Sequence, residues 1–101
     1  MPNIELASLH LLIKGRVQGV GFRYYVHQCI GVLSIHGWVR NLDDGRVEIL
    51  AEGSRKDLES FLIEVEKGPS LSQITNIIRT WEKGSGKYKG FQILATVFKP
   101  G

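Results

Sequence analysis

Hydrophobic and polar positions follow two different periods along the 101 residues of this chain. Leu9, Leu11 and Ile13 recur at every second position, which is typical of a strand with one buried face. From Phe22 the apolar residues take the spacing of a helix, which we expect to end near Ser34. The apolar positions of this helix are Phe22, Val26, Cys29, Ile30 and Leu33.

The rest of the chain repeats these two patterns. They predict strands at 35–42 and 46–52 around a turn at 43–45, a helix capped by Ser54 and ended by Gly68-Pro69, and strands at 74–81 and 91–98. The order of elements predicts one domain over residues 1–101 with an α+β, ferredoxin-like split βαβ fold (βαββαβ). Its antiparallel sheet would carry two helices on one face, with the last strand extending an edge. Because this plan hosts many unrelated activities, it does not decide the function.

The composition of the chain indicates the class of protein and the compartment to expect. Hydrophobic residues make up 43% of the chain and charged residues 23%, as in ordinary globular proteins. No apolar run approaches the ~18 residues that a membrane span needs, and Met1 to Glu5 lacks the features of a signal peptide. The single cysteine, Cys29, excludes an internal disulfide and fits a reducing compartment. We therefore expect a cytoplasmic protein that does not contact a membrane.

Glycines gather at the junction between the first strand and the first helix. The segment Gly15-Arg16-Val17-Gln18-Gly19-Val20-Gly21-Phe22-Arg23 lets the backbone curl so that its N–H groups can surround an anion in front of a helix N-terminus. Arg23 adds a planar cation that matches phosphate oxygens. The segment lacks the Gly-Lys-Ser/Thr end of a nucleoside-triphosphate loop and the third glycine of a dinucleotide fingerprint. It predicts a site for a small anion such as phosphate.

Two motifs of this chain resemble those of the acylphosphatase family. One is the glycine segment 15–23, and the other is Gly37-Trp38-Val39-Arg40-Asn41, followed by Asp44-Gly45-Arg46-Val47-Glu48. The resemblance covers roughly Leu9 to Leu94, nearly the whole chain. It implies metal-free hydrolysis of the carboxyl–phosphate bond of acyl phosphates, with inorganic phosphate as a product and no organic cofactor.

The resemblance also implies roles for individual residues. Arg23 and Asn41 would be catalytic: Arg23 would bind the phosphate, and Asn41 would position the attacking water. The remaining phosphate contacts would come from backbone amides of the loop formed by Arg16, Val17, Gln18, Gly19, Val20 and Gly21. The expected partners are an acyl phosphate and inorganic phosphate, with no nucleic acid and no metal, and the expected state is a monomer.

The chain departs from the family pattern in a few places. Ser34 stands where a glycine is expected to end the first helix, and Gly31 would lie inside that helix at a cost of about 1 kcal/mol relative to alanine. Leu42 follows Asn41 where some members carry Thr or Ser, which would remove a polar contact near the water. These differences concern the stability of the helix and an auxiliary contact.

Two other functions stay open at this stage. The chain could be a phosphate-binding or regulatory domain of the same fold that has lost catalysis, although both Arg23 and Asn41 are present. It could also be an RNA-binding module, since such modules share the split βαβ plan and Lys89-Gly90-Phe91 faintly resembles one of their motifs. That motif lies at the start of the last strand rather than on a central strand. Hydrolysis of an acyl phosphate would separate these alternatives from the enzyme.

Overall fold

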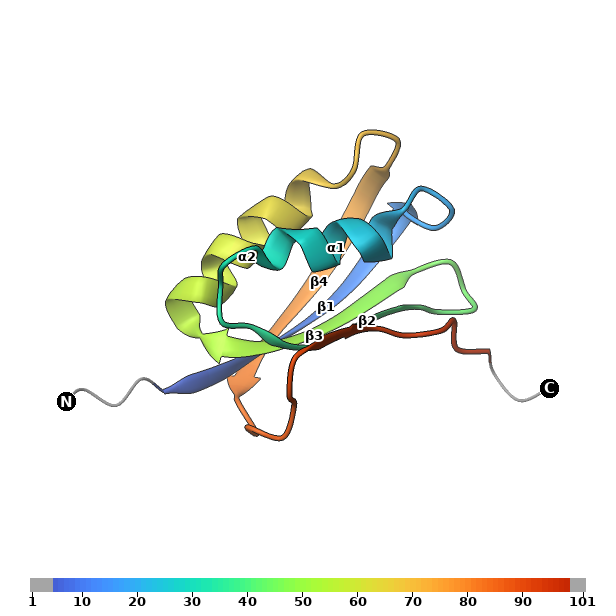
Figure 1. Cartoon of the computed structure of the whole chain (residues 1–101). Helices are drawn as coiled ribbons and strands as arrows, with labels where there is room; N and C mark the ends of the chain where they lie inside the picture. Colours follow the sequence, from blue (N-terminus) through green and yellow to red (C-terminus); the bar gives the residue numbers. More distant parts are fainter. Residues whose placement is uncertain (1–4, 99–101) are drawn as a thin grey trace.

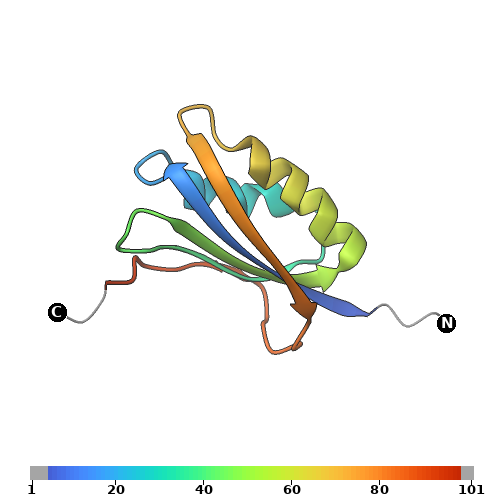
Figure 2. The same cartoon turned by 180° about the vertical axis from the view of Figure 1, so that it is seen from behind.

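The computed structural model of the chain describes residues 5–98. The elements are β1 (Leu6–Arg16), α1 (Phe22–Ile30), β2 (His36–Asn41), β3 (Val47–Ser54), α2 (Arg55–Lys67), β4 (Gln73–Lys83) and β5 (Phe91–Ile93). The strands form one sheet in the order β4-β1-β3-β2-β5. Both helices cover the same face (Figure 1), and the view from behind shows the face that they leave open (Figure 2). The ferredoxin-like α+β fold is confirmed.

The core fills the space between the sheet and the two helices. Leu9, Leu11 and Ile13 of β1 are fully buried, as their alternation predicts. They pack with residues of the helices and the other strands, namely Val17, Phe22, Val26, Ile35, Val39, Val47, Ile49, Ala51, Leu58, Phe61 and Val65. Burial of this single core holds α1 and the loop before it against the ends of β1 and β2.

Helix α1 ends earlier than the apolar pattern predicts. It stops at Ile30, and Gly31 caps it with φ 53° and ψ −118°, so the expected end near Ser34 is wrong. Because only glycine adopts positive φ without strain, Gly31 ends the helix here and does not weaken its interior. Ser34 then lies outside the helix, where its N–H donates a long 3.4 Å bond to the carboxylate of Asp57. The predicted cap of α2 is confirmed by the bond from Asp57 N to Ser54 Oγ (3.1 Å).

The fifth strand differs from the prediction in length and direction. It covers Phe91–Ile93, not 91–98, and it runs parallel to β2, so the sheet is mixed and not wholly antiparallel. The following segment stays beside β2, because Leu94 N donates to Val39 O and Val97 N donates to Asn41 O. The ladder breaks at Leu94, whose carbonyl instead accepts a bond from Arg23.

The connection from β4 to β5 crosses beneath the end of the sheet from one edge to the other (Figure 1). The buried carboxylate of Glu52 accepts bonds from the backbone N–H groups of Ser85 (2.8 Å) and Gly86 (3.0 Å). At its far end Gly90 N donates to His36 Nδ1 at 2.7 Å. These bonds fix the connection and so help to place β5 beside β2.

Strand β1 lies inside the sheet, between the edge strand β4 and the central strand β3. Its register with β3 runs from Leu6 opposite Ser54 to Ile13 opposite Val47. Its register with β4 runs from Ala7 opposite Lys83 to Arg16 opposite Gln73, with an irregularity after Lys14. The glycine loop therefore leaves the sheet at the end of an interior strand, close to the end of β2.

Candidate active site

The loop between β1 and α1 turns sharply at two glycines. Gly19 and Gly21 have φ values of 74° and 75°, a backbone conformation that other residues seldom adopt. Gly21 is the N-cap of α1, and since glycine has no side chain, no side chain occupies the first N–H groups of the helix. The first turn of α1 also carries no acidic residue. The loop and helix start therefore present N–H groups and a partial positive charge to an anion.

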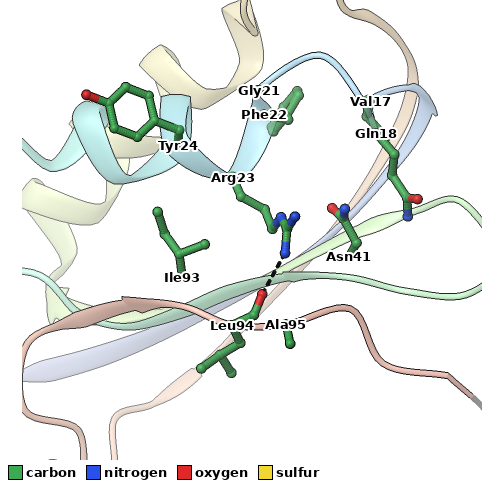
Figure 3. A pocket seen from close by; sticks show the side chains of 11 residues that line it. Val17, Gln18, Gly21, Phe22, Arg23, Tyr24, Asn41, Ile93, Leu94 and Ala95 are labelled. Carbon is green, nitrogen blue, oxygen red and sulfur yellow. Dashed lines mark hydrogen bonds between the residues drawn. The ribbon is translucent and has the colours of Figure 1, made fainter.

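Arg23 lies in the first turn of α1, directly after this loop. Its side chain crosses to the end of β5, where Nη1 donates to Leu94 O at 2.8 Å. Figure 3 shows this bond and the guanidinium reaching into a cavity. Because the bond uses only one of the guanidinium donors, the rest of the planar fork remains for an anionic ligand.

Asn41 is the last residue of β2 and approaches the same cavity from the sheet. Its backbone is held on both sides, since it lies opposite Val47 in the ladder with β3 and its carbonyl accepts from Val97 N at 3.0 Å. The side chain of Asn41 points toward the cavity that holds the Arg23 guanidinium (Figure 3). An amide side chain offers both donors and an acceptor there.

Gln18 connects the glycine loop to the hairpin that carries Asn41. Its Nε2 donates to the carbonyls of Leu42 (2.7 Å) and Arg46 (2.9 Å) at the β2–β3 turn. The prediction places Gln18 among the backbone donors to phosphate, and the structure adds this second role for its side chain. The side chain fixes the distance between the loop and the strand end.

The cavity between these elements has a volume of about 370 Å³. The polar residues that line it come from the loop, α1 and β2. Its apolar residues come from the loop and α1 (Val17 and Phe22) and from β5 and the segment after it (Ile93, Leu94 and Ala95). Tyr24 of α1 lines the same cavity. None of the lining residues is acidic, so the charge of Arg23 is not opposed there.

The predicted site residues are not all equally close to this cavity. Val17, Gln18, Gly19, Gly21, Arg23 and Asn41 line it. Arg16, at the end of β1, is exposed, and Val20 packs partly buried against the core. Neither Arg16 nor Val20 is among the residues that line the cavity.

Residues 93–95 belong to the cavity although the sequence does not single them out. The carbonyl of Leu94 orients Arg23, and a backbone carbonyl leaves no trace in the identity of its residue. The sequence offered one general indication of this segment, because the last predicted strand was expected to extend an edge of the sheet. Its direction, parallel to β2, places this segment beside Asn41.

Two clusters away from the cavity have shifted pKa values. On the open face of the sheet, His10 Nε2 and Arg40 Nε each lie 2.7 Å from the carboxylate of Glu48. Burial raises the pKa of Glu48, but the hydrogen bonds from His10 and Arg40 outweigh burial and hold it below its ordinary value. In α1, burial raises the pKa of the Cys29 thiol. Cys29 is therefore a packing residue and not an activated nucleophile.

Residues 5–98 contain no group of three or more His, Cys, Asp or Glu side chains that could hold a metal ion. Within the same residues, no helix is long and apolar enough to cross a membrane.

Comparison with known proteins places the chain among acylphosphatases. The sequence model of the acylphosphatase family matches residues 9–93. An acylphosphatase from Bacillus subtilis (strain 168) is 44% identical over 89 residues, which cover 88% of this chain and 98% of that protein. The crystal structure of acylphosphatase from Bacillus subtilis superposes with a TM-score of 0.83 at 42% identity, covering 87% of this chain and 98% of that one.

The chain is also similar to part of a longer protein. The crystal structure of HypF from T. kodakarensis matches 92% of this chain with a TM-score of 0.77 and 30% identity, but the match covers only 12% of that chain. The same fold thus occurs both as a small protein and as one portion of a larger one.

Proposed function

The chain belongs to the acylphosphatase family, and we propose that it hydrolyses the carboxyl–phosphate bond of acyl phosphates in the cavity beside Arg23. It is an enzyme, an acylphosphatase. The observation that carries the location of the site is that Arg23 and Asn41, from separate elements, reach into one cavity bordered by the glycine loop.

The phosphoryl group binds to the backbone N–H groups of the loop from Arg16 to Gly21 and to the guanidinium of Arg23. During transfer the negative charge spreads over the phosphoryl oxygens. Donors that are already aimed at these oxygens stabilise this charge without reorganising, and the bond from Arg23 to Leu94 O holds the guanidinium in place. The N-terminus of α1 adds a partial positive charge.

Asn41 orients the water that attacks phosphorus. The water oxygen forms a bond to phosphorus while the bond from phosphorus to the acyl oxygen breaks, and the electron pair of that bond leaves with the carboxylate. An amide side chain can hold a water but cannot keep its proton. We therefore assign the proton to an oxygen of the phosphoryl group, which departs as inorganic phosphate. A carboxylate is a good leaving group, so the reaction does not require a strong side-chain base.

The test is hydrolysis of benzoyl phosphate by the purified chain with EDTA present. We expect turnover that survives EDTA. Arg23→Ala should lose both turnover and the affinity for phosphate, measured by direct binding. Asn41→Ala should lose about two to three decades of turnover while its affinity for phosphate is retained. Asn76→Ala, which changes an exposed asparagine on β4, is the matched control and should keep full activity.

A pH–rate profile completes this test. A titrating side-chain base near neutral pH would contradict the transfer of the proton to the phosphoryl group. An Asn41→Ala variant with full activity would contradict the role of Asn41. A folded chain without turnover would favour the other reading, a phosphate-binding or regulatory domain, for which the match to a small part of HypF is the supporting observation.

The RNA-binding alternative finds less support. Phe91, the aromatic residue of the faint motif, contacts the rings of Phe61 and His27 on the helix-covered face, at centroid distances of 6.2 Å each. A ring in that position does not present its face to a base on the open side of the sheet. We further propose that the enzyme acts as a monomer in the cytoplasm without nucleic acid, which size-exclusion chromatography with light scattering tests for the oligomeric state.

A further inference from the structure

The cavity has two unlike sides, and Arg23 lies between them. Figure 3 shows Asn41 on one side of Arg23 and the side chains of Tyr24 and Ile93 on the other. Asn41 offers a polar side chain on its side, whereas Tyr24 and Ile93 make the opposite side apolar and aromatic.

The apolar side is open to solvent. Tyr24 is 64% exposed and Ile93 is 43% exposed, although both line the cavity. No hydrogen bond of the Tyr24 hydroxyl is found among residues 5–98, so contacts of that group do not explain the position of the ring. An exposed ring and a branched aliphatic side chain that face one cavity beside an anion site are suited to be covered by an apolar part of a ligand.

The in-line geometry of phosphoryl transfer indicates which part of the substrate lies against Tyr24 and Ile93. In phosphoryl transfer the attacking and leaving oxygens are roughly in line across phosphorus. If Asn41 holds the water, the leaving carboxylate and the acyl group attached to it extend away from Asn41. In this cavity that direction leads past Arg23 to Tyr24 and Ile93.

We propose that the enzyme prefers acyl phosphates with an apolar acyl group of about the size of a benzene ring, and that Tyr24 and Ile93 recognise this group. The inference rests on the proposed function, because it takes the phosphoryl position and the role of Asn41 from it. An acyl group that carries a second carboxylate is disfavoured, since its charge would lose water against Tyr24 and Ile93 without gaining a partner there.

The experiment compares kcat/KM for benzoyl phosphate and for acetyl phosphate in the wild type and in variants. Ile93→Ala and Tyr24→Ala together should lower the ratio of the two values by about tenfold, while inhibition by inorganic phosphate changes by less than about twofold. Tyr24→Phe keeps the ring and should keep the ratio. Ile63→Ala, which changes an exposed isoleucine on α2, is the matched control.

The outcomes separate this inference from the function on which it rests. If acetyl phosphate is hydrolysed in a way that needs Arg23 but the ratio does not respond to Tyr24 and Ile93, the inference is wrong and the function stands. If both substrates lose the same factor in the double variant, Tyr24 and Ile93 support the fold of the cavity and do not select the acyl group. If the folded wild type hydrolyses neither substrate, the proposed function and the inference both fail.

Discussion

Replacing Gln18 by alanine tests whether the glycine loop has to be fastened to the β2–β3 hairpin. The substitution removes the two bonds that Nε2 donates to Leu42 O and Arg46 O. Neither carbonyl becomes an orphan, because Leu42 O still accepts from Gly45 N and Arg46 O still accepts from Leu42 N. The loss in unfolding free energy is therefore at the low end for two hydrogen bonds, about 1–2 kcal/mol.

The effect on activity follows from the same bonds. Without these bonds the loop samples positions in which its N–H groups do not surround the phosphate. Ordering the loop again when phosphate binds then costs part of the free energy that the Gln18 bonds had contributed. A cost of about 1.4 kcal/mol corresponds to a tenfold change, so we expect kcat/KM to fall and the inhibition constant for phosphate to rise by about tenfold. Chemical denaturation measures the first effect, and steady-state kinetics with phosphate as inhibitor measures the second.

Two further variants test whether the effect comes from the N–H groups of the Gln18 side chain. Gln18→Met has a similar length without the N–H groups and should behave like Gln18→Ala. Gln28→Ala changes an exposed glutamine on α1 and should have no effect. A Gln18→Ala enzyme that loses stability but keeps its kcat/KM and its phosphate affinity would refute the reasoning, because the loop would then hold its shape without the tie.

Three further predictions concern the scaffold. Gly31→Ala should lower the unfolding free energy by about 1–2 kcal/mol in thermal denaturation, because a residue with a side chain is strained at the φ of 53°. A steric clash adds nothing to this cost, since no atom lies within 4 Å of the added Cβ. An increase in stability would mean that the helix continues through residue 31. Glu48→Gln should destabilise the fold at neutral pH by about 1–2 kcal/mol, since Glu48 has a lowered pKa in the folded state and so contributes stability above its ordinary pKa of 4.5 that is lost as the pH falls. The difference between the variant and the wild type should therefore vanish in acid, and a difference that persists there would contradict the ion-pair explanation. Cys29 should react with iodoacetamide at neutral pH more slowly than free cysteine, since burial raises its pKa, and equal rates would contradict its packing role.

The sequence was sufficient for the elements that local patterns determine. The alternation at Leu9, Leu11 and Ile13 and the Ser54 cap predicted β1 and the start of α2, because burial and capping depend on residues close together in the chain. The end of α1 was misplaced because apolar spacing continues to Leu33, whereas the backbone at Gly31 already turns away. A single glycine in a helical pattern is compatible with either outcome, and the tertiary setting decides between them.

The candidate site divides in the same way. The sequence was enough to predict Arg23, Asn41 and the glycine loop as site residues. The chemistry of the first two lies in their side chains, and that of the loop lies in the absence of side chains at its glycines. The groups that hold Gln18 and Arg23 in place could not be predicted. They are the backbone carbonyls of Leu42, Arg46 and Leu94, which any residue at those positions would supply. The apolar side of the cavity was missed for another reason: it depends on β5 running parallel to β2, and a strand pattern does not state direction.

The interior position of β1 in the sheet has a consequence for how the chain reaches its structure. This interior strand precedes the other four strands in the chain, and one of its neighbours, β4, becomes available only when residues 73–83 have been made. Closing so long a loop costs entropy before the pairing can repay it, so we expect folding on a timescale of milliseconds to seconds rather than microseconds. Until β4 docks, one edge of β1 is unpaired and can join a strand of another molecule. Aggregation through β1 should therefore compete with folding most strongly just before β4 pairs with β1, and less once Ala7 lies opposite Lys83.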